Sequence, residues 1–329
     1  MADHIVARGA GERRMNWALV FGLLATACAV GGWLSGESFY LRLATEALIF
    51  GCLAMAVDLL LGIAGLLSLG QALFFGFGAY LSSLLLRDAG MGFWTVLAIA
   101  LAGGALAGLV GGLIAIRSRG VYFALITFGM AQIVAKVVYN SAPLGASDGF
   151  IGVPVPRVPL GFFEVSADQP FAFFMVVLAL VLAVYVLLAY LLDTPFGRNM
   201  QALRDNPQRL SFLGFDPFRY KLAVFIIAAA VSSFAGALYP MLRGFASPEL
   251  IYFQTSGNAV ITVVLGGVGT LIGALYGSVI LFGLKSVLGS YTEHHLIIVG
   301  VLFILAVVFF PAGLMGAFRK KGGKRYGKH

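Results

Sequence analysis

The stretch FAFFMVVLALVLAVYVLLAYLL, Phe171–Leu192, contains no charged residue, no glycine and no proline. A run of roughly 18 or more apolar residues is long enough to cross the hydrocarbon core of a membrane as a helix. A helix also satisfies its own backbone hydrogen bonds, which the membrane interior requires. The run lacks the alternation of polar and apolar residues that is typical of barrel strands. This stretch therefore predicts a transmembrane helix.

Further apolar runs on both sides of this stretch extend the prediction to most of the chain. The 329 residues are 60% hydrophobic and 11% charged, with a mean hydropathy of +0.96. Soluble domains are nearer 45–50% apolar and about 25% charged. We predict an all-α, polytopic transmembrane bundle at 17–311, between an N-terminal tail at 1–16 and a basic tail at 312–329. The predicted spans, about ten in number, are Trp17–Leu34, Leu41–Leu61, Ser68–Leu86, Trp94–Ile116, Val121–Tyr139, Phe171–Leu192, Leu222–Leu242, Thr255–Gly267, Leu271–Leu288 and Leu296–Phe310.

The basic residues predict the orientation of these spans, because cytoplasmic loops are enriched in Lys and Arg. With the N-terminus inside, sixteen of the 22 basic residues fall on the cytoplasmic side, and an even number of spans also puts both tails there. The predicted inside residues are Arg8, Arg13, Arg14, Arg117, Arg119, Arg198, Arg204, Arg209, Arg219, Lys221, Arg319, Lys320, Lys321, Lys324, Arg325 and Lys328. The predicted outside residues are Arg42, Arg87, Lys136, Arg157, Arg243 and Lys285.

Two of the predicted spans differ from plain membrane helices. Thr255–Gly267 is short, and LGGVGT (265–270) predicts a tight glycine turn after it. The stretch GIAGLLSLGQALFFGFGAY (62–80) contains five glycines, which weaken an isolated helix. Short or interrupted segments occur where the backbone lines a cavity, whereas glycines also allow neighbouring helices to pack closely. The sequence leaves both interpretations of the glycine-rich stretch open.

A polar segment at 194–220 interrupts the apolar runs near the middle of the chain. Thr194-Pro195 and Asn206-Pro207 each combine a favoured helix cap with a proline at the first helical position. They predict two short helices, the second ending near Gly214, before Asp216-Pro217 starts the next membrane helix. Met200, Leu203, Leu210 and Leu213 cluster at helical spacing. The segment is either a solvated loop at the lipid headgroups or a stiff docking element for a cytoplasmic partner.

No pattern in the chain predicts catalysis, a cofactor or a bound metal. The phosphate-binding pattern G-x-x-x-x-G-K-[ST] is absent, and Gly283–Ser286 is a poor partial match inside an apolar run. Glu293-His294-His295 has no nearby fourth ligand and does not predict a metal site. The net charge is +8, and the charged residues lie at the edges of apolar runs. This placement indicates membrane topology and not binding to nucleic acid. Any ATP energy must come from a separate chain.

The sequence resembles the permeases of branched-chain amino-acid ABC importers, specifically the LivM type. The resemblance extends over roughly residues 41–316. Its motifs, in chain order, are GIAGLLSLGQALFFGFGAY (62–80), GVYFALITFGMAQI (120–133), SDGFIGVP (147–154), TPFGRNMQALRDN (194–206), LGFDPFRYKLAVF (213–225), FAGALY (234–239), SPE (247–249) and VVLGGVGTLIGALYG (263–277).

The resemblance implies a partnership in a bacterial inner membrane. Such importers combine two related permeases, here a second one of the LivH type, with two cytoplasmic ATPases and a periplasmic binding protein. The segment from Arg198 to Gly214 matches the coupling region that contacts the ATPase. The residues matched there are Arg198, Arg204, Asp205, Asn206 and Gly214. The sequence departs from the family pattern at three places: Asp58 replaces a frequent Asn, residues 207–210 read PQRL where the family usually has a pair of alanines, and Pro311-Ala312-Gly313 replaces a frequent basic-Pro-Arg-Gly ending.

Polar residues inside the predicted spans are candidates for the translocation path, because they are costly in a membrane and often functional. Gln71 and Asn258 lie on the two unusual segments. Asp58 lies about a turn from the predicted inner end, where structural pairing and a path role are equally expected. We expect Glu46 about a turn inside the outer face. Lys136 and Lys285 lie near outer ends, where their long side chains can reach water.

The external segments 140–170 and 243–254 are rich in Pro, Gly and aromatic residues, and we expect them to receive the binding protein. The expected cargo is a branched-chain or related apolar amino acid, and urea, short amides or aromatic acids are close alternatives. An ion-driven carrier would need carboxylates at mid-depth, and the positions predicted for the two membrane acids disfavour it. A purely structural membrane subunit is the third alternative.

Overall fold

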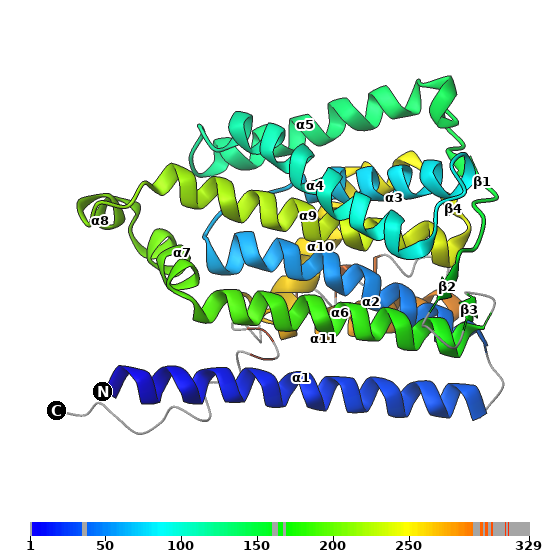
Figure 1. The fold of residues 1–329 in the computed structure, drawn as a ribbon, viewed down its shortest axis with the longest axis horizontal. Helices are drawn as coiled ribbons and strands as arrows, with labels where there is room; N and C mark the ends of the chain where they lie inside the picture. Colours follow the sequence, from blue (N-terminus) through cyan, green and yellow to red (C-terminus); the bar gives the residue numbers. More distant parts are fainter. Residues whose placement is uncertain are drawn as a thin grey trace.

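The computed structural model is an elongated bundle in which the long helices run along a common direction (Figure 1). It describes residues 2–34, 38–159, 164–166 and 169–291, together with single residues or pairs between 297 and 315. The helices are α1 (Ala2–Leu34), α2 (Ser38–Asp58), α3 (Gln71–Arg87), α4 (Phe93–Ala115), α5 (Val121–Tyr139), α6 (Pro170–Asp193), α7 (Pro195–Asp205), α8 (Pro207–Phe212), α9 (Pro217–Arg243), α10 (Phe253–Gly266) and α11 (Ile272–Tyr291). Short helical turns are η1 (Leu59–Ile63), η2 (Ala142–Leu144) and η3 (Pro248–Ile251).

The all-α membrane architecture is confirmed, whereas the predicted count of about ten spans is not. Within the described part of the chain, six helices are long and apolar enough to cross a membrane. The apolar part of α1, Asn16–Gly32, is shorter, and α3 and α10 have only 17 and 14 residues. The predicted span Leu296–Phe310 lies largely outside the described residues. The six are Ser38–Ile63, Phe93–Ala115, Val121–Tyr139, Pro170–Asp193, Pro217–Arg243 and Ile272–Gly289.

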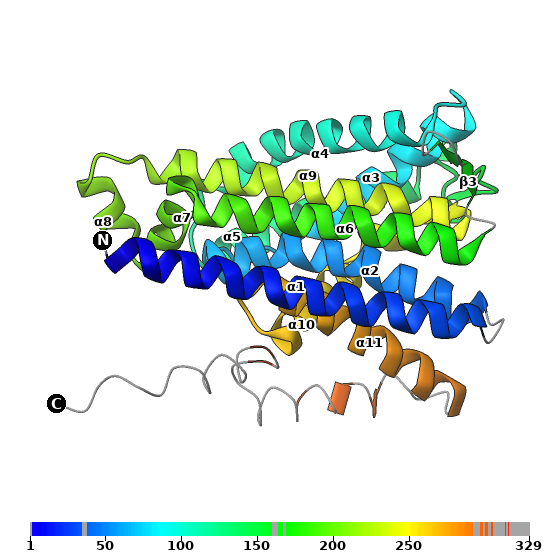
Figure 2. The same ribbon diagram turned by 60° about the horizontal axis from the view of Figure 1, so that its bottom comes forward.

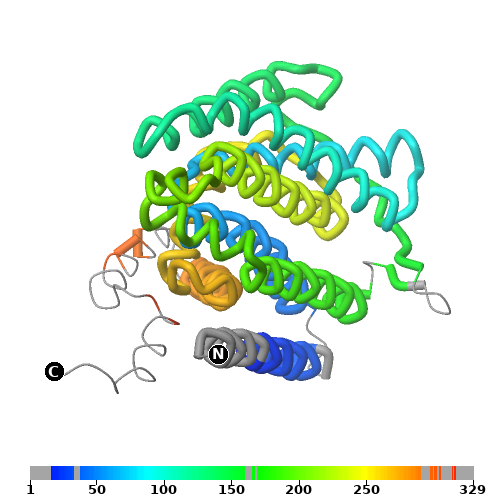
Figure 3. Tube along the Cα trace, turned by 60° about the vertical axis from the view of Figure 1, so that its left-hand side comes forward, coloured from blue at the N-terminus to red at the C-terminus, as the bar shows by residue number. Residues whose placement is uncertain are grey.

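Helix α2 lies at the centre of the bundle and α1 at its edge. From Ala47 onward almost all of α2 is buried, and α2 packs against α9, α6, α10 and α11. On one side, α9 also contacts α3 and α4, and α5 lies beyond them (Figure 3). On the other side, α1 packs mainly on α6 and leaves large apolar side chains such as Leu19 and Leu23 exposed. Exposed apolar side chains at the edge fit a helix that faces lipid.

The crossing of α3 and α9 depends on small residues. A Cβ atom at Gly78 of α3 would collide with the carbonyl oxygen of Ser233, and one at Gly236 of α9 would collide with the carbonyl oxygen of Phe75. Close backbone approach of this kind is how membrane helices associate without a hydrophobic driving force. For the second half of the glycine-rich stretch 62–80, the close-packing interpretation is therefore correct.

The two ends of the bundle carry different structures. Helices α7 and α8 lie at the end from which α1 starts, and the short strands lie at the opposite end (Figures 1 and 2). There β1 (Phe150–Ile151) pairs with β4 (Phe245–Ala246), and β2 (Arg157–Pro159) pairs with β3 (Glu164–Ser166). The β1–β4 pair joins the two segments predicted to be external, 140–170 and 243–254, into one surface.

Candidate functional site

Helices α7 and α8 form an elbow between α6 and α9, and each of its helix starts is set by a local cap. The Thr194 hydroxyl accepts a hydrogen bond from the Gly197 N–H at 3.3 Å. The Asn206 side-chain oxygen accepts from the N–H groups of Gln208 at 3.0 Å and Arg209 at 3.1 Å. The Asp216 carboxylate accepts from the Phe218 N–H at 2.9 Å and starts α9. These bonds confirm the two short helices predicted for the polar segment.

The inner side of the elbow is apolar, and its tip is exposed. Met200, Leu203 and Leu210 are buried, as their spacing predicts. The prediction that Leu213 joins them is wrong: it is 73% exposed, and Phe212 is 88% exposed. The reason is that α8 ends at Phe212, and the chain then turns through Gly214, whose φ is +84°. The turn directs residues 212 and 213 away from the bundle.

Four of the five predicted coupling residues, Arg198, Arg204, Asp205 and Gly214, are exposed at the elbow, and Asn206, whose side chain caps α8, is half-buried. Arg204 also contacts the membrane domain, because its guanidinium donates a hydrogen bond to the carbonyl oxygen of Gly62, in η1.

Asp58 joins the end of α2 to the turn between α10 and α11. Its carboxylate is fully buried and accepts hydrogen bonds from the N–H groups of Gly269 at 2.6 Å and Leu271 at 2.8 Å. Buried carboxylates need partners of this kind to offset the loss of water. The sequence predicted Asp58 as a path residue or a structural partner at the inner end, and the geometry shows the structural contact.

The chain between η1 and α3 is not helical, so the predicted span Ser68–Leu86 is interrupted at its start. The Leu69 N–H donates to the Thr127 hydroxyl of α5 at 3.2 Å, and a Cβ atom at Gly70 would collide with the Thr127 carbonyl. The first half of the glycine-rich stretch is therefore interrupted as a helix, and at Gly70 it also packs closely against α5.

A buried polar cluster lies where this interruption ends. It consists of Ser68, Gln71, Ser232 and Ser256, and we call it the central polar cluster. The Ser232 hydroxyl donates to the Gln71 side-chain oxygen at 3.0 Å, and the Gln71 amide lies 3.5 Å from the Ser68 hydroxyl. The Ala72 N–H donates to the Ser256 hydroxyl at 2.9 Å. The starts of α3 and α10, the two short helices, therefore meet in the interior.

Only part of the central polar cluster was predicted from the sequence. Gln71 belongs to the cluster, but it is fully buried and hydrogen-bonded and does not face an open path in this conformation. Asn258 is half-buried on α10, two residues after Ser256. Ser232 and Ser256 were missed, although a serine pair at 232–233 inside an apolar helix is a detectable signal.

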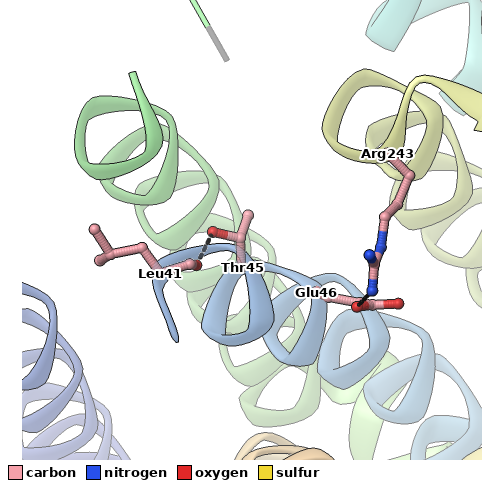
Figure 4. Close-up of polar contacts among 4 residues, drawn as sticks. All are labelled: Leu41, Thr45, Glu46 and Arg243. Carbon is pink, nitrogen blue, oxygen red and sulfur yellow. Dashed lines mark hydrogen bonds and ion pairs between the residues drawn. The ribbon is translucent and has the colours of Figure 1, made fainter. Parts of the chain in front are cut away.

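A second polar link ties α2 to α9 at the strand-bearing end (Figure 4). Arg243, the last residue of α9, forms a hydrogen-bonded ion pair with Glu46 of α2. The two side chains are 45% and 12% exposed, respectively. Glu46 and Gly62 lie sixteen residues apart along α2 and η1, so the links to Arg243 and Arg204 are separated by about 24 Å at helical rise.

Among the described residues, no group of three or more His, Cys, Asp or Glu side chains is arranged to hold a metal ion. The triplet Glu293-His294-His295 lies outside them. Lys136, near the strand-bearing end of α5, lies over the ring of Tyr139 with its ammonium 5.0 Å from the centroid.

Comparisons with known proteins agree on one family. Residues 39–307 match the family described as the permease component of the branched-chain amino acid transport system. The high-affinity branched-chain amino acid permease protein LivM of Salmonella typhimurium is 32% identical over 294 residues, which cover 83% of this chain and 69% of the relative. LivH of Escherichia coli K12 is 23% identical over 292 residues, covering 81% and 91%. The ribose import permease protein RbsC of Bacillus subtilis is 29% identical over 174 residues, covering 48% and 46%. No solved structure matches the chain significantly.

Proposed function

The chain belongs to the family of permease components of branched-chain amino acid transport systems, and we propose that it forms part of the membrane path of an ATP-driven importer. Its relatives of the LivM and LivH kinds are permease subunits of transporters, and the chain has six membrane-competent helices in its described part. The proposed cargo is a branched-chain or related apolar amino acid.

The observation that carries the proposal is the elbow of α7 and α8. It is a short, capped, polar structure between two long apolar helices, α6 and α9. Its tip exposes Phe212 and Leu213 beside Arg209 and Gly214. An elbow with an apolar tip suits contact with a soluble ATPase, because exposed aromatic side chains are typical anchors of interfaces. Arg198, Asp205 and Asn206 lie on the same elbow.

The proposed assembly contains a second permease of the LivH type, two cytoplasmic ATPases and a periplasmic binding protein, in a bacterial inner membrane. In it the elbow and both termini face the cytoplasm. The joined segments 140–170 and 243–254 then face the periplasm and receive the binding protein. Their β1–β4 pairing supports this role, since a receiving surface needs a fixed shape.

The central polar cluster is the proposed midpoint of the path. Gln71 and Asn258 lie on the two short helices whose starts meet there. Half-helices that begin inside a membrane protein direct backbone N–H groups at polar cargo groups. In the present conformation the Ala72 N–H at the start of α3 bonds to the Ser256 hydroxyl of α10, so the path at this level opens when α3 and α10 separate. Asp58, at the cytoplasmic end of α2, fixes the turn that follows α10.

An ion-driven carrier receives no support from the membrane carboxylates. Glu46 is paired with Arg243, and Asp58 is bonded to the backbone amides of the α10–α11 turn. Asp58 is the last residue of α2, and Glu46, nearer the middle of α2, is paired with the last residue of α9, so neither is a free carboxylate at mid-depth. A coupling-ion site near the midplane would need such a group.

The test is reconstitution of the complex that co-purifies with the full chain from its native membrane. Proteoliposomes with ATP inside and the binding protein outside should accumulate labelled leucine, isoleucine or valine. ATP without the binding protein, and an ion gradient without ATP, should give background uptake. Uptake driven by the ion gradient alone would contradict the proposal. Calorimetry of the binding protein against amino acids, urea and short amides identifies the cargo.

A further inference from the structure

We propose that Arg204 is a positioning residue that connects the α7–α8 elbow to two segments of the membrane domain, the stretch before α3 and the turn after α10. A movement of the elbow would then also move the two short helices that meet at the central polar cluster. The inference rests on the proposed function. It assigns Arg204 an inward role, whereas the motif resemblance places the residue with the surface that contacts the ATPase.

The first contact of Arg204 is with the segment that precedes α3. Its guanidinium donates to the Gly62 carbonyl. Its stem packs so closely on Gly65 that a Cβ atom there would lie 2.9 Å from the Arg204 Cγ. Gly65 also has a φ of +70°, a conformation that favours glycine. The Arg204 side chain therefore contacts the start of the non-helical stretch that ends at Ser68 and Gln71.

Arg204 also lies near the turn that follows α10. A Cβ atom at Gly269 would lie 3.7 Å from the Arg204 Nη1 and 3.2 Å from the Gly62 carbonyl oxygen. Gly269 is held from the other side by the Asp58 carboxylate. One arginine thus faces two turns that are about 200 residues apart in sequence.

These two turns lead to the same place. The segment after Gly62 and Gly65 enters α3, and the helix before Gly269 is α10. The starts of α3 and α10 are joined by the hydrogen bond from the Ala72 N–H to Ser256. A shift of α7 that carries Arg204 with it moves both turns, and through them it acts on the contact between the two short helices.

An arginine fits this role better than a lysine. Its planar guanidinium holds its N–H donors in a fixed geometry, and the Nη1 that bonds to Gly62 also lies near Gly269. A lysine ammonium is a compact point charge on a flexible stem and is not held in this geometry. The conservative variant Arg204→Lys should therefore retain part of the tie and lose part of it.

The first experiment is hydrogen exchange on the full chain in nanodiscs, and it needs no transport activity. In Arg204→Ala, the amides of Gly269 and Leu271 should exchange about tenfold faster or more, because the turn opens locally. The α5 amides should be unchanged. Arg204→Lys should give an intermediate rate, and the exposed control Arg117→Ala should match the unmodified chain. Unchanged exchange in the turn, or faster exchange throughout α5, overturns the inference.

The second experiment measures ATP hydrolysed per amino acid imported by the reconstituted complex. Arg204→Ala should raise this ratio at least several-fold while ATP hydrolysis continues, and Arg204→Lys should restore it in part. An equal fall in import and hydrolysis would assign Arg204 to the ATPase surface and contradict the positioning role. If the unmodified complex itself shows no ATP-driven import, the proposed function fails. The exchange experiment still tests whether Arg204 holds the turn after α10.

Discussion

Asp58 and Arg204 contact the same residue, Gly62, from two sides. The Asp58 carboxylate occupies the space in which a Cβ atom at position 62 would lie, and Arg204 donates to the Gly62 carbonyl. The acid comes from the central helix α2 and the base from the elbow helix α7. This arrangement places an acidic and a basic side chain at one end of the bundle, where each has backbone partners.

The variant Gly62→Ala should destabilise the chain by about 1–3 kcal/mol, because the added methyl group collides with the Asp58 carboxylate and the Gly269 backbone. Thermal unfolding in detergent, followed by tryptophan fluorescence, measures the change. The matched control is Gly129→Ala in α5, where a Cβ atom meets nothing within 4 Å. That control should be neutral, or stabilising by up to about 1 kcal/mol through helix propensity. Equal effects at the two positions would contradict the close approach at Gly62.

Asp58→Asn should be milder than Asp58→Ala. The asparagine side chain retains one carbonyl acceptor, so one of the two N–H groups, of Gly269 or Leu271, keeps its bond. Alanine leaves both buried donors unsatisfied, at a cost of about 1–3 kcal/mol for each. Unfolding midpoints in detergent should therefore fall in the order unmodified chain, Asp58→Asn, Asp58→Ala. The reverse order of the two variants would argue against the double acceptor role.

The ion pair at the opposite end should respond asymmetrically to mutation. Arg243→Ala leaves the Glu46 carboxylate, only 12% exposed, without its main partner. Glu46→Gln leaves Arg243, which is 45% exposed and can turn to water. We expect a loss of about 1–3 kcal/mol for Arg243→Ala and of under about 1 kcal/mol for Glu46→Gln. The double variant should be more stable than Arg243→Ala alone, and stabilities in the opposite order would contradict this account.

Single introduced thiols test the orientation of the elbow. In a chain with Cys28 and Cys52 replaced, Gln201→Cys and Gln208→Cys should react with an impermeant maleimide only after the inner face is opened. Ser147→Cys, exposed near the strand-bearing end, should react in intact cells, because the two ends lie on opposite sides of the membrane. Labelling of positions 201 and 208 in intact cells would place the elbow outside and remove its proposed contact with an ATPase.

The parts of this molecule that local rules determine are predictable from sequence. Thr194, Asn206 and Asp216, each followed by proline, mark the helix starts of the elbow, and the structure has a cap at each. The glycine-rich stretch was recognised as unusual, but glycine both breaks helices and permits close packing. Both occur here, the break at Gly70 and the packing at Gly78, and only tertiary contacts separate them.

The contacts of the candidate site were less predictable, because they join distant segments. Arg204 lies in a polar segment and matches a motif, so sequence reasoning assigned it to the coupling region that contacts the ATPase. Its hydrogen bond to Gly62 depends on α7 packing against η1. Gln71 was recognised from its position, but its partner Ser232 is 161 residues away. Asp58 and Arg204 were assigned separate roles, since no local pattern shows that both contact Gly62.

The local caps of the elbow have a consequence for how such permeases diverge. A segment whose bends are set by its own side chains and prolines keeps its shape when the rest of the chain changes. Its exposed tip, Phe212 and Leu213, can therefore vary after gene duplication without disturbing the anchor formed by Arg204 and Gly62. In the proposed assembly, two sister permeases can therefore come to favour different ATPase subunits through a few substitutions at this tip, without changes in the membrane interior.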